Sequence, residues 1–241
     1  HIRTGEARDV DIDGDILVLA DGGSGVKFFR IKEEPHRLEL AGEYSSPFYI
    51  SAVTAKKGTA FLAGGLGGAE IVDFRDPSAP RLLWREEFSE VRGLAADEDY
   101  LYIADGFEGF HIYSISTMPP ARVGGANTPG WNCDLFIDGD VLYAAEGGEG
   151  IMTLDVSDRS SPVVLDAVST GSIARELHAL AGTLFVASHR GGITAVDVSD
   201  PGEIRIAAEY RTVDDARGVF TDGEFVYLAS GSGGLYIFRY R

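Results

Sequence analysis

Six copies of a glycine-anchored motif, a two-residue apolar periodicity and recurring Asp-Gly turns predict an all-β fold, a six-bladed β-propeller of four-stranded repeats. The pattern runs through all 241 residues, and successive anchor glycines are 41 to 43 residues apart. A repeat of about 40 residues is typical of propeller blades, because each blade covers its apolar faces by packing on its neighbours. The anchors are Gly25, Gly68, Gly109, Gly150, Gly192 and Gly234.

Each repeat predicts the same order of strands. Val10 and Ile12 alternate with polar residues before Asp13-Gly14, and an apolar strand follows at Ile16–Ala20. An Asp-Gly pair favours a tight hairpin turn, because glycine accepts a positive φ. A third strand begins after the anchor glycine, and a fourth follows a proline-bearing loop, as at Val163–Val168. No stretch has the apolar stripe of an amphipathic helix.

We expect one domain over residues 1–241. Its repeats cover approximately residues 7–44, 48–88, 91–126, 130–168, 174–210 and 215–241. The last repeat ends after its third strand, so the sixth blade is expected to be closed incompletely or by an N-terminal stub at His1–Arg3. An unpaired edge at Leu235–Tyr240 would then accept a strand from a partner.

Three segments resemble the LVIVD repeat of bacterial and archaeal surface or secreted proteins. They are AEIVDFRDPSAP at Ala69–Pro80, GIMTLDVSDRSSP at Gly150–Pro162 and GITAVDVSDP at Gly192–Pro201. The resemblance extends over essentially the whole chain and is strongest around Gly68, Gly109, Gly150 and Gly192. It implies a propeller and an extracellular or cell-surface location, with the periplasm as an alternative. It implies no particular reaction, because a fold does not determine a function.

The composition disfavours several partners. The chain has 38 acidic and 21 basic residues, a net charge of −17, which repels nucleic acid phosphates and anionic lipids. No apolar run approaches the roughly 18–20 residues of a membrane-spanning helix. A single cysteine, Cys133, excludes an internal disulfide and a cysteine-cluster metal site. We therefore expect no nucleic acid partner and no membrane insertion.

Arginine recurs 17 residues before the anchors, where the first strand of each repeat begins. The six residues at this position are Arg8, Ser51, Arg92, Cys133, Arg175 and Arg217. We expect these side chains around one mouth of a central channel, near the residues four positions before the anchors. Those residues are Asp21, Gly64, Asp105, Glu146, Ser188 and Ser230. The arginines either pair with these acids, as Arg8 with Asp21 and Arg92 with Asp105, or bind an anionic ligand. Arg175 and Arg217 have no such acid in their own repeats.

Other residues carry further candidate sites. His178 and His189 fall in one repeat near Arg175 and could supply a general acid or base, or could be satisfied by backbone groups. Trp131, like Phe48 and Tyr49, lies in a loop before a first strand and could anchor a partner or plug the channel mouth. The acids at Asp9–Asp15 resemble the start of a calcium loop, but the position that needs a bidentate glutamate is Ala20.

The sequence thus favours a noncatalytic extracytoplasmic propeller that binds a protein or a surface polymer. The binding candidates are Arg8, Arg92, Arg175, Arg217, Trp131, His178 and His189. The alternative is an enzyme with its active site at the channel mouth around His178, His189 and Arg175. We expect no catalytic residue, no metal and no cofactor in the favoured interpretation.

Overall fold

The fold is all-β. The computed structural model describes residues 4–32 and 37–240, which contain 23 strands and one short 3₁₀ helix. The strands form six sheets that follow one another along the chain, five of four strands and one of three. The predicted six-bladed β-propeller fold is therefore confirmed. No helix in the described ranges is long and apolar enough to cross a membrane.

Each sheet is one blade. Blade 1 contains β1 (Asp9–Asp13), β2 (Ile16–Ala20), β3 (Val26–Lys32) and β4 (Arg37–Tyr44), and blade 2 contains β5 (Ala52–Lys56), β6 (Thr59–Ala63), β7 (Ala69–Asp73) and β8 (Arg81–Glu86). Blade 3 contains β9 (Gly93–Ala96), β10 (Tyr100–Ala104), β11 (Phe110–Ser114) and β12 (Ala121–Ala126), and blade 4 contains β13 (Asp134–Asp138), β14 (Val141–Ala145), β15 (Ile151–Asp155) and β16 (Val163–Val168). Blade 5 contains β17 (Glu176–Leu180), β18 (Thr183–Ala187), β19 (Ile193–Asp197) and β20 (Arg205–Tyr210), and blade 6 contains β21 (Ala216–Thr221), β22 (Phe225–Ser230), η1 (Gly231–Gly233) and β23 (Gly234–Arg239).

The chain divides into two compact units, and each is described by itself. Unit 1 contains His1–Asp105 and Tyr113–Arg122, and unit 2 contains Gly106–Ile112 and Val123–Arg241. Blades 1 and 2 belong to unit 1, and blades 4, 5 and 6 belong to unit 2. The strands of blade 3 are shared between the units.

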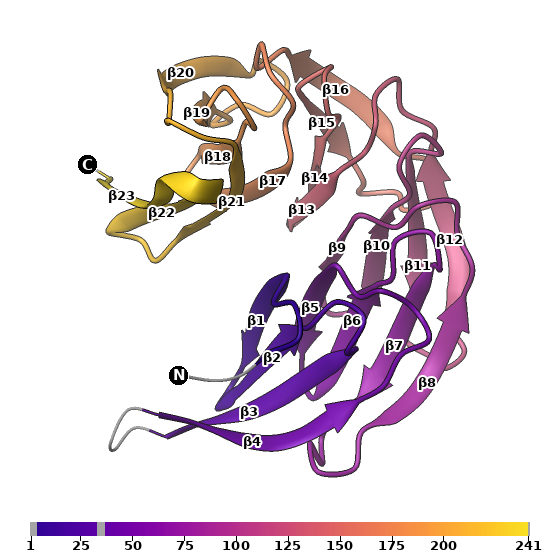
Figure 1. The fold of residues 1–241 in the computed structure, drawn as a ribbon. Coiled ribbons are helices and arrows are strands. Elements are labelled where there is room, and N and C mark those ends of the chain that lie inside the picture. The colour runs from indigo at the N-terminus through magenta and orange to yellow at the C-terminus, as the bar shows by residue number, and fades with distance from the viewer. Residues whose placement is uncertain (1–3, 33–36, 241) are drawn as a thin grey trace. The chain divides into compact units, whose positions relative to one another are not determined.

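Within a blade the strands lie side by side in chain order, as β13 to β16 do in Figure 1. The Asp-Gly turns form the predicted hairpins, with Asp13 paired to Ile16 in blade 1. The turn glycine Gly14 has a φ of 62°, a backbone angle that a residue with a Cβ rarely adopts. The local residue pattern therefore determines where each first hairpin turns.

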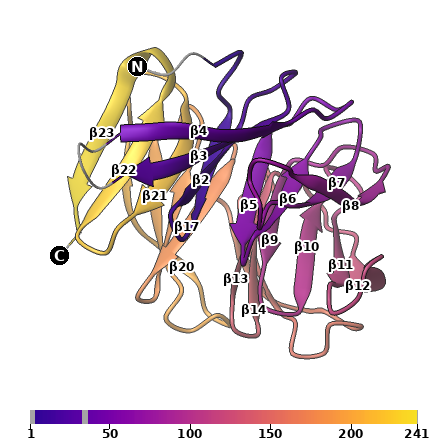
Figure 2. The ribbon, with the colours of Figure 1, turned by 90° about the horizontal axis from the view of Figure 1, so that it is seen from below.

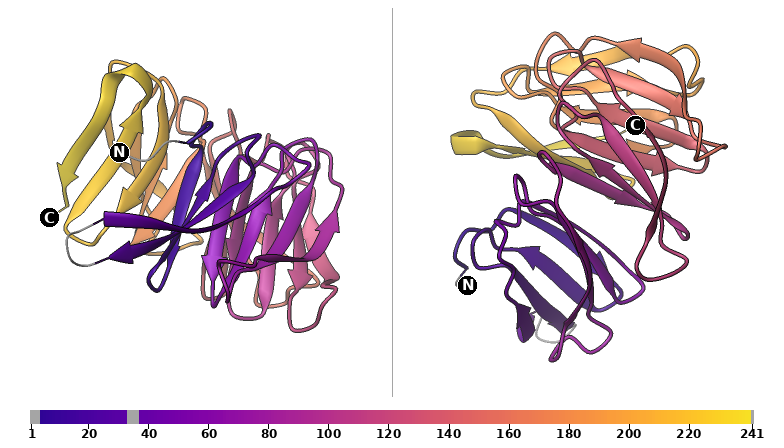
Figure 3. Two further views of the ribbon diagram at one scale, coloured as in Figure 1. Left: turned by 60° about the horizontal axis from the view of Figure 1, so that its bottom comes forward. Right: turned by 90° about the vertical axis from the view of Figure 1, so that its right-hand side faces the viewer.

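The sixth sheet has three strands in the described part of the chain, β21, β22 and β23 (Figures 2 and 3, yellow). This agrees with the expectation that the last blade lacks a fourth strand of its own sequence. The stub expected at His1–Arg3 lies outside the described residues.

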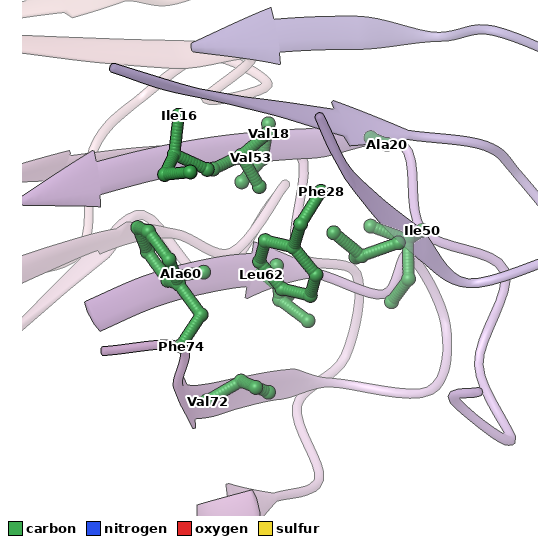
Figure 4. Close-up of a cluster of buried hydrophobic side chains, with 11 residues drawn as sticks. Ile16, Val18, Ala20, Phe28, Ile50, Val53, Ala60, Leu62, Val72 and Phe74 are labelled. Atoms are coloured by element: carbon green, nitrogen blue, oxygen red, sulfur yellow. The ribbon is translucent and has the colours of Figure 1, made fainter. Parts of the chain in front are cut away.

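The core of unit 1 lies between blades 1 and 2. Phe28 of β3 stacks on Phe74, with ring centroids 5.0 Å apart, and Val18 and Leu62 pack in the same fully buried cluster (Figure 4). Burying each such side chain stabilises the fold by about 1.5–3 kcal/mol. The apolar faces of the strands are thus buried between neighbouring blades. A single repeat would leave these faces exposed, which explains why it would not fold alone.

The core of unit 2 follows the same plan. Tyr143 of blade 4 packs with Leu184 and Val196 of blade 5. Phe185 of blade 5 packs with Val226 and Leu228 of blade 6. Each pair of neighbouring blades in this unit therefore shares one buried apolar layer.

Carboxylates on the first strands join neighbouring blades. In unit 1, three side chains of blade 1 accept hydrogen bonds from backbone N–H groups of blade 2. The pairs are Asp9 with Val53 (2.9 Å), Asp11 with Ala55 (2.7 Å) and Asp13 with Gly58 (2.5 Å). These bonds explain the acidic run that resembles the start of a calcium loop. Burial raises the pKa of Asp9 to about 6, although hydrogen bonds from Val53 and Val10 act in the opposite direction.

The same arrangement recurs in unit 2. Asp134 of β13 accepts a 3.0 Å hydrogen bond from Leu177 N–H on β17, and Glu176 accepts a 3.2 Å bond from Val219 N–H on β21. The carboxylates satisfy N–H groups that face the neighbouring blade, and a buried N–H without a partner would cost about 1–3 kcal/mol. Glu176 therefore joins blades 5 and 6.

Candidate functional site

Each anchor turn pairs with the segment that precedes the first strand of the next blade. We call such a pair of segments a lip. Five lips are joined by isolated backbone bridges, at Gly22 and Ile50, Gly65 and Val91, Gly106 and Asn132, Gly147 and Ala174, and His189 and Ala216. All six anchor glycines have φ between 79° and 114°, as their repeated place in the sequence predicts. The lips form the backbone frame for the predicted site residues.

The acids four positions before the anchors are buried and hold the segment before the first strand. In blade 1, Asp21 accepts hydrogen bonds from the N–H groups of Gly5 (2.8 Å) and Glu6 (2.6 Å) and forms an ion pair with Lys27 at 2.5 Å. The expected pair of Asp21 with Arg8 is therefore wrong. Lys27 reaches the acid instead, from the second position after the anchor glycine on β3.

Blades 3 and 4 use their acids in a similar way. Asp105 accepts a 2.6 Å hydrogen bond from Glu90 N–H. Glu146 accepts bonds from Gly130 N–H (3.2 Å) and the Asn132 side-chain amide (3.1 Å). Burial raises the pKa of Glu146, against the effect of its hydrogen bonds. These acids accept hydrogen bonds from the backbone of the lips, so their role is structural.

Arg8 and Arg92 each form an ion pair with a glutamate two residues earlier in the chain. Arg8 lies 3.4 Å from Glu6, and its guanidinium lies over the ring of Tyr49 at 5.7 Å. Arg92 lies 2.5 Å from Glu90. Both pairs are partly exposed to solvent, where an ion pair contributes little to stability.

Arg175 and Arg217, both in unit 2, differ from these two arginines. Neither has a carboxylate within ion-pair distance in the described ranges, and the Nε of Arg175 is buried without a hydrogen-bond partner. The sequence indicates this difference, because blades 5 and 6 carry Ser188 and Ser230 where blades 1, 3 and 4 carry acids. Two arginines of unit 2 are thus available to an anionic group.

The two histidines of blade 5 lie in different surroundings. The ring of His178 packs between Phe136 (5.6 Å) and Phe220 (4.9 Å), and its buried Nδ1 has no hydrogen-bond partner. Burial lowers the pKa of His178, so the neutral imidazole is favoured. This histidine is therefore a packing residue between the first strands of blades 4, 5 and 6.

His189 lies at the lip of blades 5 and 6. Its Nε2 is 3.0 Å from Asp215, which also has Arg190 at 3.9 Å. The turn holds His189 at a φ of 40°, an uncommon conformation for a residue with a side chain. No hydrogen bond or ion pair joins His189 to His178 or Arg175 in the described residues, and the alternative active site stays a prediction.

Trp131 lies in the lip of blades 3 and 4 and stacks on Phe107, with centroids 6.0 Å apart and ring planes 16° from parallel. Phe107 is 73 % exposed, so the pair presents an aromatic surface to solvent. Cys133, two residues later, donates a hydrogen bond to the Trp131 carbonyl at 3.2 Å. The sequence pointed to Trp131, but Phe107 escaped notice because it stands inside a glycine-rich turn.

The aromatic residues of blade 2 are less accessible. Phe48 lies beneath the guanidinium of Arg85 at 5.3 Å, and Gly64 and Gly67 leave room for its ring. Arg85 in turn donates a 2.6 Å hydrogen bond to the buried carboxylate of Glu70. Phe48 is therefore part of the structure of its lip.

The comparisons with known proteins agree with this fold. The sequence matches the LVIVD repeat family over residues 90–118, 129–170 and 173–212. The matched segments contain the anchors Gly109, Gly150 and Gly192, whereas the resemblance around Gly68 has no match. No curated protein sequence matches the chain.

Several solved structures share the fold at 10–12 % sequence identity. The computationally designed Ika8 protein has a TM-score of 0.75, with 98 % of this chain and 72 % of that chain covered. BamB from Moraxella catarrhalis has a TM-score of 0.66, with 96 % and 69 % covered. A putative 6-phosphogluconolactonase from Bacteroides uniformis has a TM-score of 0.81, with 95 % and 78 % covered. At this identity the similarity shows the fold alone, and the chain is a β-propeller that contains LVIVD repeats at residues 90–118, 129–170 and 173–212.

Proposed function

We propose that this chain is a noncatalytic binding module that acts outside the cytoplasm and binds a protein or a surface polymer through the lips of unit 2. The observation that carries the proposal is the exposed stacked pair of Phe107 and Trp131. Aromatic side chains contribute large contact areas at little entropic cost and are enriched at binding hot spots. The resemblance of the repeats to surface and secreted proteins supports the location.

The arginines of the same unit complement this aromatic surface. Arg175 and Arg217 lack ion pairs in the described residues, while the chain carries a net charge of −17. An arginine without a carboxylate partner can bind a carboxylate or phosphate of the ligand in a bidentate manner. The aromatic pair suits an apolar or ring-shaped portion of a ligand, and the arginines suit an anionic group.

Replacing Phe107 or Trp131 by alanine is expected to weaken binding by at least about tenfold, because a hot-spot side chain contributes about 2 kcal/mol or more. Binding is measured by biolayer interferometry against immobilised surface polysaccharide and surface protein fractions of the source cells. Leu66→Ala is the matched control, since Leu66 occupies the position of Phe107 in the turn of blade 2 and is 80 % exposed. Equal binding by all variants would contradict the proposal.

A second route for binding a protein is addition of a strand to β23. In the described residues β23 pairs only with β22, whereas the third strand of every other sheet lies between two strands. Its side chains Leu235 and Ile237 are 62 % and 57 % exposed. A free strand edge provides N–H and C=O groups for an extended peptide of a partner.

The register of blade 1 specifies a probe peptide. In β3 and β4, Phe29 pairs with Leu40 and Arg30 with Glu39, and the sequence of β3 around Phe29-Arg30 matches Phe238-Arg239 of β23. A peptide with the sequence of Arg37–Tyr44 would therefore place a glutamate opposite Arg239. We expect this peptide, and not a scrambled one, to slow hydrogen exchange of the outward amides of β23. Slow exchange in the chain alone, or no effect of saturating peptide, would rule out this route.

A further inference from the structure

A pocket of about 480 Å³ lies between blades 4 and 5 on the side of the Asp-Gly turns. Its wall in blade 4 includes Phe136, Asp138 and Tyr143. Its wall in blade 5 includes Leu180, the last residue of β17, and Val198, which follows β19. All of these residues belong to unit 2, and the pocket is separate from the lips.

At one position in the wall of this pocket, blade 5 has a smaller residue than blade 2 has. The residue six positions after each anchor donates its N–H to the turn between the first two strands, as Val198 does to Gly182 (2.8 Å) and Phe74 does to Gly58 (2.8 Å). In blade 2, Phe74 fills the space against blade 1 and is 2 % exposed. The side chain of Val198 is much smaller, which leaves space against Tyr143.

A second comparison concerns the polar groups of the pocket. In blade 3 the hydroxyl of Tyr102 donates to the turn residue Asp97 at 2.8 Å, and in blade 6 that of Tyr227 donates to Asp222 at 2.7 Å. Tyr143 and Asp138 occupy the same positions in blade 4.

The hydroxyl of Tyr143, however, has no hydrogen-bond partner in the described residues. Burial, and secondly the negative charge of Asp138, raises the pKa of Tyr143, and both residues line the pocket. The hydroxyl and the carboxylate are therefore both available to a molecule in the pocket.

We propose that this pocket binds a small organic ammonium ion whose apolar body packs between the blades. Asp138 is the one charged residue among those that line the pocket, and no basic side chain lines it. An ammonium group donates hydrogen bonds, so it can use the Asp138 carboxylate and the Tyr143 hydroxyl oxygen as acceptors. The rings of Phe136 and Tyr143, 6.4 Å apart, attract a cation through their faces, while Leu180 and Val198 contact the apolar body.

The test compares three probes of one shape: 2-phenylethylammonium, the neutral 2-phenylethanol and the anionic 3-phenylpropionate. Binding is followed by chemical-shift changes in ¹H–¹⁵N spectra of the whole chain. We expect the ammonium to shift the amides of Leu180 and its neighbours and to bind at least about tenfold more tightly than the alcohol, with no binding of the anion. Equal affinity for the three probes would mean that the pocket recognises only the apolar body and not the ammonium group, and would overturn the proposal.

Variants locate the site. Asp138→Asn is expected to weaken ammonium binding about tenfold and Tyr143→Phe several-fold, whereas Tyr102→Phe, which removes a hydroxyl already bonded within blade 3, leaves it unchanged. Val198→Phe introduces the side chain that blade 2 uses and should abolish binding. If Val198→Phe does not fold, Val198→Ile provides a smaller reduction of the pocket and a partial loss. Unchanged affinity in Asp138→Asn and in the Val198 variant would place the ligand elsewhere and overturn the proposal.

Discussion

Gly150→Ala is expected to destabilise the protein by about 4 kcal/mol and to lower its unfolding midpoint by roughly 10 °C. Gly150 has a φ of 99°, a conformation that strains any residue with a Cβ. A Cβ built there would lie 2.3 Å from the carbonyl oxygen of Val168 and 2.7 Å from the Cα of Ser169. Both contacts are with backbone atoms, so no side chain can rotate away to relieve them. The measurement is thermal and denaturant unfolding followed by circular dichroism.

Gly148→Ala is the matched control, because Gly148 lies in the same turn and its added Cβ would have no atom within 4 Å. We expect this substitution to change stability by less than about 0.5 kcal/mol, as is usual for an exposed site without strain. Similar losses in both variants would mean that the turn tolerates no change for another reason, and the conformational argument for the anchor would be wrong.

The contribution of Asp9 to the free energy of unfolding is expected to fall as the pH rises from 4 to 7. The folded protein raises the pKa of Asp9 from an ordinary value of 3.8 to about 6, so the folded state holds its proton where the unfolded chain has lost it. The contribution is complete below the unfolded pKa and is lost as the pH passes through the folded pKa. A difference of this size is equivalent to about 2 kcal/mol between pH 4 and pH 7.

The variant Asp9→Asn isolates this effect, because its amide oxygen can still accept the hydrogen bond of Val53 N–H but cannot titrate. Relative to the original protein, the variant is expected to gain about 2 kcal/mol of unfolding free energy between pH 4 and pH 7, measured by urea unfolding at each pH. Asp197→Asn is the control, since hydrogen bonds from Ser199 lower the pKa of Asp197 and confine its effect to more acidic pH. A stability difference for Asp9→Asn that is constant with pH would contradict the prediction.

The sequence by itself determined the elements and their order. Strand signals are local: the expected strands Ile16–Ala20 and Val163–Val168 coincide with β2 and β16. The turn signals are local too, because only glycine adopts the positive φ of Gly14 or Gly150 without strain. The regular spacing of the anchors then determined the number of blades, since each repeat must pack on another to cover its apolar faces. Trp131 could also be singled out in advance, because a large aromatic residue in a loop is noticeable.

The tertiary structure alone decided the partners of the polar groups. Asp9 and Asp11 look like part of a turn or an ion site in the sequence, but the N–H groups that they bind are 44 residues away on the next blade. Arg8 and Asp21 have suitable charges for each other, yet Lys27 is closer to the acid and Glu6 to the arginine. The pocket beside Tyr143 is lined on its other side by Val198, which comes from another blade. Hydrogen bonds and ion pairs form over a few ångströms, and cavities are lined by residues equally close together, often from segments distant in the chain. The periodicity of the sequence carries no information about those distances.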